Sequence, residues 1–203
     1  MSESTNTAPA KTDFTFSNSL STLNIPPGAY IANHPSLFGL IVGAVVILNS
    51  RALLIQRAAT DGFPLAWECA GGGVDADDAT ILHAVGRELR EETGLVMTHV
   101  LALLDDETEF DGREGRWRKL TFLVQVQSGH DGRPGVDASD SELPAVILEP
   151  EEHQDFAWVT EAEVRAGRCD GREIRLGYEA QRAVILKGFR MTEQGGLAGE
   201  ERA

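Results

Sequence analysis

Runs of apolar residues along the middle of the chain have the length and spacing of strands. A nearly continuous β-branched run predicts a buried strand, and a second apolar run follows it after a polar turn, so the two are expected to form a hairpin. A later run alternates apolar and polar positions, which is the period of a half-buried strand. Strands are predicted over residues 39–48, 52–57, 67–70, 96–104 and 116–127.

The apolar period changes after the three glycines at 71–73. Apolar residues now recur four positions apart along one stripe, which predicts a helix with one face in the core. The residues of this stripe are Ile81, Val85 and Leu89. Asp78 or Thr80 is a suitable N-cap, and Gly94 followed by Leu95 is a typical helix end.

The order of these elements predicts the fold class. A hairpin, a short strand, a helix, further strands and C-terminal helices fit an α/β chain in which a mixed sheet lies between helices. A capping box at Thr160–Glu163 and an apolar stripe over 178–189 predict the two C-terminal helices. We divide the chain into an extension at 1–38, a domain at 39–191 and a disordered tail at 192–203.

The N-terminal extension has two parts. Residues 1–13 are polar and are expected to be disordered. Residues 14–38 contain many apolar side chains around a turn signal at 26–28, too many for a free tail. We expect this part to pack on the domain or on a second copy of it, which leaves a homodimer open.

Composition and charge exclude some classes of partner. The chain has 203 residues, is 42% hydrophobic and carries a formal net charge of −14. Such an acidic protein lacks the basic face that nucleic acid polymers or anionic membranes need, but it can still take a phosphorylated small molecule through a local cation. Only Cys69 and Cys169 are present, without metal-like spacing. With no basic leader and no long apolar run at the N-terminus, we expect a cytoplasmic protein.

Three glutamates, Glu88, Glu91 and Glu92, share one face of the predicted helix near its end. Like charges at this spacing repel, and the helix dipole disfavours negative charge in the last turns. Gly86 weakens the same helix by about 1 kcal/mol relative to alanine. Such local conflicts tend to mark functional sites. One interpretation is a helix face that is simply exposed to solvent. The other is a site for a hard cation such as Mg²⁺, which prefers oxygen ligands and would turn the repulsion between the carboxylates into attraction.

The same segment resembles the Nudix box, G-x5-E-x7-R-E-U-x-E-E-x-G-U, in which U is a bulky apolar residue. Residues 87–95 match the second half of the box at every fixed position, and Gly73 matches its opening glycine. The dipeptide Trp67-Glu68, which precedes the glycines, adds to the resemblance.

One position departs from the box. Its isolated glutamate falls on Ala79. The neighbouring Asp77 and Asp78 are candidate substitutes, although the count does not place them there, and an engineered replacement at 79 is a further alternative. We therefore expect a working or weakened enzyme, and we expect Ala79→Glu to raise its rate or its metal affinity.

The resemblance implies the α/β/α sandwich with a mixed sheet that is typical of Nudix domains. It also implies a hydrolase that depends on Mg²⁺, with Mn²⁺ as an alternative ion. The implied substrate is a nucleoside diphosphate linked to another group, such as ADP-ribose or a nucleotide sugar. Water attacks one phosphorus and the other phosphate leaves, with the metal neutralising charge and activating the water.

The resemblance also assigns roles within the box. Glu88, Glu91 and Glu92 are the implied carboxylate ligands of the metal, with a backbone carbonyl of Gly72 or its neighbour as a further ligand. Glu88 is also a candidate proton acceptor for the attacking water. Arg87 is implied to hold a glutamate in place by a charge-assisted hydrogen bond.

Residues outside the box complete the candidate site. The acidic loop before Trp158-Val159 can supply a metal ligand or a catalytic base, with Glu152 as the first candidate and Glu151 as the second; an exposed acidic loop is the alternative. Candidate substrate-binding residues are Arg57, Glu68 and Arg116. Both arginines have plainer alternatives, a surface position for Arg57 and pairing with nearby acidic residues for Arg116.

Two other functions are weighed against the hydrolase. The departure at Ala79 favours a module that binds a nucleotide without cleaving it. An apolar lining from the 14–38 extension would instead suit a prenyl diphosphate. Substrate choice is expected to depend on this extension and on the loops at 105–115 and 128–144.

Overall fold

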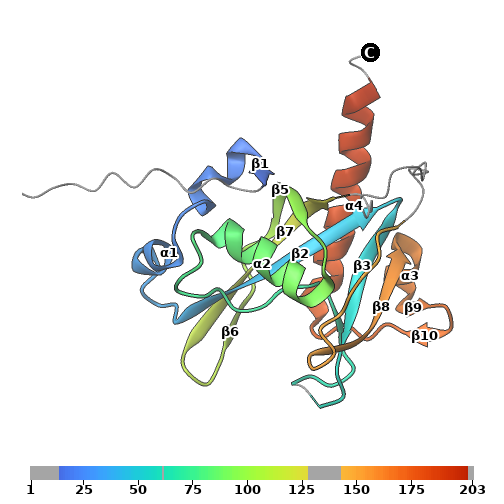
Figure 1. Cartoon of the computed structure of the whole chain (residues 1–203), viewed down its shortest axis with the longest axis horizontal. Coiled ribbons are helices and arrows are strands. Elements are labelled where there is room, and N and C mark those ends of the chain that lie inside the picture. The colour runs from blue at the N-terminus through green and yellow to red at the C-terminus, as the bar shows by residue number, and fades with distance from the viewer. Residues whose placement is uncertain (1–13, 61, 128–142, 201–203) are drawn as a thin grey trace, which may run out of the picture.

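The computed structural model describes residues 14–60, 62–127 and 143–200. Within them, eight strands form a sheet with helices on both faces (Figure 1). The strand order is β1-β5-β7-β2-β3-β4, with β6 beside β7 and β8 beside β3. The strands are β1 (Thr15–Phe16), β2 (Gly39–Leu48), β3 (Arg51–Arg57), β4 (Trp67–Glu68), β5 (Met97–Asp105), β6 (Glu109–Asp111), β7 (Arg116–Val126) and β8 (His153–Thr160). The pairs β1–β5 and β2–β7 are parallel and the others antiparallel, so the predicted mixed sheet is confirmed.

Strands β2 and β3 form the predicted hairpin but soon separate. Asn49 and Ser50 form its tight turn with φ values of 48° and 58°. The two strands pair at the residues next to this turn and then diverge, as Figure 1 shows, with β2 following β7 and β3 following β8. The segment after β4 runs alongside β2 instead, because the amide of Val42 donates to the Gly72 carbonyl at 2.9 Å. The glycines therefore lie where the sheet opens.

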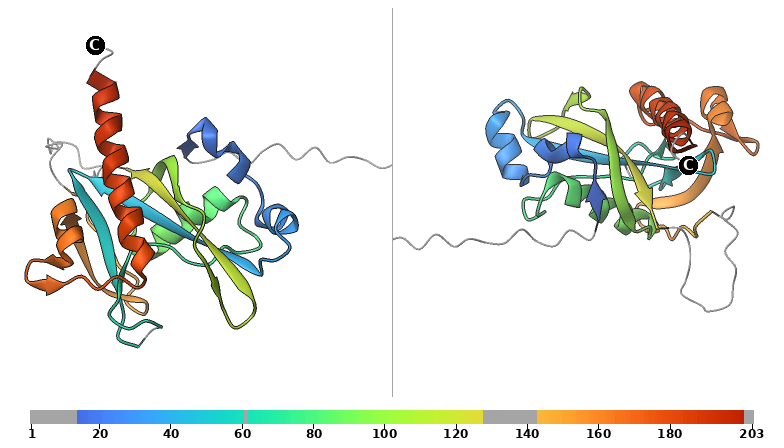
Figure 2. Two further views of the ribbon diagram at one scale, coloured as in Figure 1. Left: turned by 180° about the vertical axis from the view of Figure 1, so that it is seen from behind. Right: turned by 90° about the horizontal axis from the view of Figure 1, so that it is seen from above.

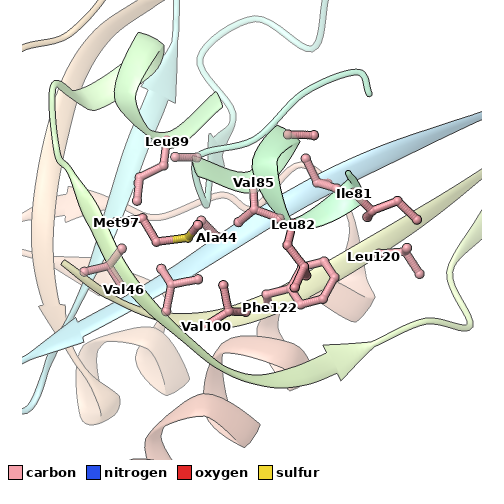
Figure 3. Packing of buried hydrophobic residues seen from close by; sticks show 14 of the residues in the cluster. Ala44, Val46, Ile81, Leu82, Val85, Leu89, Met97, Val100, Leu120 and Phe122 are labelled. Carbon is pink, nitrogen blue, oxygen red and sulfur yellow. The ribbon is translucent and has the colours of Figure 1, made fainter. Parts of the chain in front are cut away.

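Helix α2 (Ile81–Thr93) covers one face of the sheet. It starts at the N-cap Thr80, whose side chain accepts from the His83 amide, and ends at Gly94. Figure 3 shows its apolar stripe directed onto side chains of β2, β5 and β7. A Cβ at Gly86 would lie 3.0 Å from Met97 Cε, so close packing onto β5 explains this glycine without a functional role.

The opposite face is covered by α3 (Glu161–Ala166) and α4 (Glu179–Glu200), with the small hairpin β9 (Arg168–Cys169) and β10 (Arg172–Glu173) beside them. Figure 2 shows α2 and α4 on opposite sides of the sheet, and each side has its own apolar cluster. The capping box predicted at Thr160 and Glu163 is confirmed. Cys69 and Cys169 are both buried and free.

Residues 192–200, which the sequence led us to assign to a disordered tail, instead continue helix α4. No proline interrupts this segment, and a helix anchored by the buried Ile185 and Phe189 can propagate at low cost despite the later glycines. Figure 1 shows these last turns extending beyond the sheet. Residues 201–203 lie outside the described part of the chain.

The N-terminal extension packs on its own domain. β1 adds to the sheet beside β5, and η1 (Asn18–Leu23) and α1 (Pro27–Asn33) follow it. The extension also completes the start of α2, because the Ile25 carbonyl accepts from the Ile81 amide at 3.1 Å and Asn24 Oδ1 accepts from the Thr80 hydroxyl at 3.0 Å. Residues 1–13, which we predicted to be disordered, lie outside the described residues. Most of the 128–144 loop also lies outside them.

Among the described residues, no helix is both long enough and apolar enough to cross a bilayer.

Candidate active site

A pocket of about 510 Å³ opens where the glycine segment meets α2. It is formed by the end of β3, the glycines, one face of α2 and the loop that precedes β8. The lining residues are Arg57, Thr60, Gly71, Gly72, Gly73, Glu88, Glu92, Glu151 and Glu152. Most of the candidates from the sequence thus meet in one place.

The glycines let the backbone approach the carboxylates closely. A Cβ at Gly71 would lie 2.1 Å from the Val42 carbonyl oxygen, and its φ of 150° is unfavourable for other residues. A Cβ at Gly72 would lie 2.5 Å from Glu88 Oε2. The Gly71 amide donates to Glu92 Oε2 at 2.6 Å. A side chain at Gly72 would therefore displace Glu88, and one at Gly71 would collide with the backbone of β2 and disturb the amide that binds Glu92.

Arg87 is held by a complete set of hydrogen bonds. Its Nε and Nη2 donate to Asp78 at 3.0 and 2.9 Å, and Nη2 also donates to the Gly73 carbonyl at 2.9 Å. Its Nη1 donates to Glu88 Oε1 at 2.8 Å and Glu91 Oε2 at 3.0 Å. All five N–H groups of the guanidinium are used. These contacts place Arg87 against Glu88 and Glu91, and its role in positioning a glutamate stays a prediction.

Asp78 is the residue that counting along the box missed. Its side chain is 6% exposed, and although burial opposes ionisation, the Arg87 guanidinium and the Asp75 amide hold the pKa of Asp78 below its usual value. Ala79, which occupies the counted position, is exposed. Counting six residues from Gly72 instead of Gly73 reaches Asp78 with one extra residue before Arg87. That shift of one is the signal in the sequence that could have found it.

Glu92 is a buried carboxylate whose negative charge is stabilised by few neighbouring groups. It is 5% exposed, and burial together with the charges of Glu68, Glu88 and Glu152 raises its pKa to about 8, against the one favourable hydrogen bond from Gly71. Burial also raises the pKa of Glu88, although Arg87 opposes this shift. The exposed Glu152 completes the group of carboxylates that face the pocket.

His153 is a further residue that sequence reasoning did not assign. It is 1% exposed, and its Nε2 lies 3.8 Å from Glu92 Oε1 and 3.5 Å from Glu68 Oε1. Its Nδ1 has no hydrogen-bond partner within the described residues. The dipeptide Glu152-His153 in the acidic loop was the available signal.

The remaining candidates separate into two groups. Arg57 lines the pocket and its Nη1 donates to Glu68 Oε1 at 2.5 Å. Burial would raise the pKa of Glu68, but His153, Arg57 and Lys119 together lower it, so this carboxylate stays charged.

Glu91 and Arg116 are not brought into the pocket. The Glu91 side chain is 60% exposed and pairs with Arg87. Arg116 lies on the β6–β7 hairpin, where its Nε is 3.2 Å from Asp111 Oδ1 and its Nη1 3.8 Å from Glu109 Oε2. Their predicted roles in metal and substrate binding stay predictions that this arrangement does not support.

The donor set fits a divalent cation. Ligand atoms of Glu92, Glu152 and His153 lie within 4.8 Å of one another, with Glu88 on the same pocket wall. Oxygen-rich sets suit Mg²⁺ and Mn²⁺, and imidazole is also accepted by Mn²⁺ and other transition metals. A buried carboxylate that resists ionisation without a partner, as Glu92 does, is the kind of group a cation stabilises.

Sequence comparison identifies the domain. The model of the family described as NUDIX domain matches residues 37–176. The chain belongs to the Nudix family. This Nudix domain is 36% identical over 73 residues to the CTP pyrophosphohydrolase of Escherichia coli (strain K12). That match covers 36% of this chain and 53% of the relative, so the chain spans about half of the curated protein it matches.

Solved structures confirm the Nudix fold. A MutT NUDIX hydrolase from Burkholderia pseudomallei aligns with a TM-score of 0.53 at 22% identity, covering 73% of this chain and 96% of that one. The NUDIX domain of Shewanella oneidensis NrtR, solved with ADP ribose, aligns with a TM-score of 0.55 at 18% identity, covering 87% and 99%. At these identities the likeness carries the fold alone.

Proposed function

We propose that this Nudix domain is a divalent-metal-dependent pyrophosphohydrolase that cleaves a nucleoside diphosphate linked to another group. The observation that carries the proposal is the buried, poorly compensated carboxylate of Glu92, which faces a pocket together with Glu88 and Glu152. Burying a charge without a counterion is costly. A Mg²⁺ or Mn²⁺ ion in this pocket would supply the missing positive charge.

Glu92, Glu152 and Glu88 are the proposed ligands, with His153 beside them. The bound ion would neutralise the diphosphate, activate a water molecule and stabilise the leaving phosphate. Arg87 fixes the orientation of Glu88 through a charge-assisted hydrogen bond, which Asp78 supports from the other side. Glu88 then either completes the ligand set or accepts the proton of the attacking water.

Arg57 is the proposed phosphate contact on the opposite wall of the pocket. Among the described residues that line the pocket, it is the one cationic side chain. Its guanidinium is oriented by Glu68, the other predicted substrate-binding residue of this region, so Glu68 acts through Arg57.

The nature of the substrate is supported by the relatives. The sequence relative is named a CTP pyrophosphohydrolase, and one structural neighbour was solved with ADP ribose. Both compounds in these names, CTP and ADP ribose, contain a nucleoside attached to a pyrophosphate. The prenyl alternative finds no support in a pocket whose lining side chains are charged or polar apart from the glycines. The non-catalytic alternative rested on Ala79, and Asp78 supplies a carboxylate to Arg87 in its vicinity.

The proposal is tested by incubating the full chain with nucleoside triphosphates, nucleotide sugars and ADP-ribose, with Mg²⁺, with Mn²⁺ and with a chelator. We expect a nucleoside monophosphate as a product, formed only when a metal ion is present. Products are identified by ion-exchange chromatography. Tight nucleotide binding without turnover in either metal would overturn hydrolysis in favour of the binding module.

A further inference from the structure

The short segment 78–80, which leads into α2, is held from two sides. On the side of the pocket, Asp78 accepts two hydrogen bonds from the Arg87 guanidinium, at 3.0 and 2.9 Å. On the other side, Asn24 Oδ1 accepts a hydrogen bond from the Thr80 hydroxyl at 3.0 Å. Asn24 belongs to the N-terminal extension, which precedes the region that the family model matches. A contact from outside the matched region thus reaches within two residues of the carboxylate that anchors Arg87.

The position of Asn24 relative to α2 is fixed by further contacts of the extension. The Ile25 carbonyl accepts from the Ile81 amide at 3.1 Å, and the Ile25 side chain packs against the core cluster beneath α2. The edge of the Phe14 ring meets the His83 ring, with 5.1 Å between the ring centroids. Figure 1 shows the extension beside the start of α2. Asn24 is therefore held in place to accept from its partner before substrate arrives.

Asn24 also decides how the Thr80 hydroxyl is used. A threonine hydroxyl has one hydrogen to donate and two lone pairs that accept. When Asn24 accepts that hydrogen, the oxygen serves as acceptor for the His83 amide at 3.4 Å, which is the N-cap bond of α2, and for a proton on His83 Nδ1 at 2.8 Å. Without an acceptor at position 24, the hydroxyl can donate to His83 Nδ1 instead. The Thr80 side chain then has two hydrogen-bond arrangements in place of one.

A short polar path leads from this segment to the carboxylates of the pocket. The Asp78 side chain is 6% exposed and bonds Arg87 through both of its oxygens. The same guanidinium donates to Glu88 Oε1 at 2.8 Å and to the Gly73 carbonyl at 2.9 Å. Because the guanidinium is rigid and planar, a shift of Asp78 at one of its edges moves the donors on the other.

We propose that Asn24 is a positioning residue of the active site. Through Thr80 it restrains Asp78, and Asp78 in turn holds the guanidinium that orients Glu88. This inference rests on the proposed function and deepens it, because it gives the N-terminal extension a part in turnover as well as in folding. Asn24 acts only through other residues, so its loss affects the rate of the chemical step more than the binding of substrate.

Asn24→Leu tests the proposal, because leucine has a similar shape and lacks the acceptor. We expect kcat with Mg²⁺ to fall by about 3- to 10-fold and KM to change by less than about twofold, since the effect of an indirectly acting residue falls on the geometry of the site. Asn24→Asp keeps an acceptor for the Thr80 hydroxyl and should hold kcat within about twofold of the parent. Steady-state kinetics well below the lowest Tm of the series measure both.

Two variants of the same extension serve as controls for its stability. Asn33 lies at the end of α1, where its Nδ2 donates to the Ala29 carbonyl at 3.1 Å. The Thr15 hydroxyl lies 2.6 Å from His99 Nδ1 and helps to hold β1 against β5. Asn33→Leu and Thr15→Val loosen the extension away from segment 78–80, so they should leave kcat unchanged even where they lower Tm.

A second measurement does not depend on activity. The exchange of the Arg87 Nε–H with water is followed by NMR, with the resonance assigned from its absence in Arg87→Lys. Because this N–H donates to Asp78, we expect its exchange to become about threefold faster or more in Asn24→Leu and to stay at the parent rate in Asn24→Asp and in both controls.

A double-mutant cycle with Thr80→Val checks the route. If Asn24 acts through the Thr80 hydroxyl, the double variant should be no slower than Thr80→Val alone. Additive losses of kcat would overturn that route. If Asn24→Leu does not fold, Asn24→Ala takes its place in every comparison.

Unchanged kcat and unchanged Arg87 Nε–H exchange in Asn24→Leu would overturn the proposal, and so would an equal loss of kcat in Asn33→Leu or Thr15→Val. The extension would then act on the stability of the fold alone. If the parent protein hydrolyses no substrate, the proposed function fails, and the exchange of the Arg87 Nε–H by itself decides whether Asn24 positions the guanidinium.

Discussion

Among the residues that the structure describes, two groups of side chains have the composition of a metal site, but they differ in what their carboxylates already contact. Glu92, Glu152 and His153 form one group, and Glu163, Cys169 and Asp170 form the other. In both, the ligand atoms lie within 4.8 Å of one another. Proximity therefore does not separate them.

The charge on the carboxylates does separate the two groups. Glu163 accepts from the amide and the hydroxyl of Thr160 at 2.8 Å each, and these hydrogen bonds lower its pKa. Its negative charge completes the capping box of α3. Glu92 has one amide donor and three negative neighbours, and its pKa is raised to about 8. A carboxylate whose charge is already stabilised by hydrogen bonds, as that of Glu163 is, is stabilised little further by a bound cation. The charge of Glu92 lacks such stabilisation, so a cation would stabilise it strongly.

Replacing the central carboxylate of each group gives the largest expected difference. We expect Glu92→Gln to lower metal-dependent hydrolysis by about 1,000-fold or more, because a ligand that neutralises transition-state charge is lost. Glu163→Gln should keep activity within about twofold and lower Tm by a few degrees through the weakened cap. Steady-state kinetics and calorimetry measure both. Equal activity in the two variants would remove the distinction drawn between the groups.

The carboxylate that anchors Arg87 should come next in effect. We expect Asp78→Ala to lower kcat by about 10- to 100-fold with a smaller change in KM, because Arg87 then holds Glu88 less firmly. Asp75, which is 65% exposed and 3.6 Å from Arg87 Nη2, is the matched control, and its alanine variant should change kcat by less than about threefold. Asp78→Asn, which keeps the shape but loses the charge, should fall between them. An Asp78→Ala enzyme with normal kcat would show that the other contacts of Arg87 suffice.

The two carboxylates also predict opposite dependences of stability on pH when a chelator is present. Because the folded-state pKa of Glu92 is raised from 4.5 to about 8, the folded protein binds more protons between these values, and its stability falls as pH rises through that window. Because the pKa of Glu163 is lowered, its contribution is present above pH 4.5 and is lost as pH falls below it. Urea unfolding at several pH values checks both signs.

Matched variants separate the two contributions. In Glu92→Gln the decline of unfolding free energy between pH 5 and pH 8 should flatten, whereas in Glu163→Gln it should persist. Saturating Mg²⁺ should flatten it in the parent protein as well, since the ion stabilises the ionised form of Glu92. A parent protein whose stability rises across this range would contradict the assigned state of Glu92.

The smallest effect is expected at Ala79. The sequence alone led us to expect that Ala79→Glu would raise the rate or metal affinity. Because Ala79 is exposed and Asp78 already pairs with Arg87, the structure now leads us to expect a change of less than about twofold in kcat and in metal affinity. Kinetics at limiting Mg²⁺ would detect a larger one. A clear gain would mean that a glutamate at 79 reaches the pocket from the surface.

Local patterns were enough to predict most of the fold. The stripe of Ile81, Val85 and Leu89 specified α2, and the β-branched run specified β2, since each pattern has a single fitting period. The pocket residues near the glycines followed from the box. The sequence did not specify that α4 continues past 191, because helix propagation depends on tertiary anchoring of its earlier turns.

Contacts between distant residues account for what the sequence could not provide. His153 becomes part of the site only when β8 pairs with β3 and brings it under Glu68. Arg116 was a candidate for phosphate binding, yet the β6–β7 hairpin supplies Asp111 as its partner. The spacing of the box did not point to Asp78, because one extra residue separates it from Arg87. A fixed spacing cannot account for such an insertion.

The hydrogen bond from the Ile81 amide to the Ile25 carbonyl has a practical consequence for anyone who prepares this protein. A fragment cut at residue 37, where the shared family region begins, would lack β1, η1 and α1 and leave the first turn of α2 with an exposed donor. Cooperative unfolding should therefore include residues far upstream of the region that relatives have in common. Protein expressed from Phe14 onwards should have a higher Tm than protein expressed from Leu37 onwards.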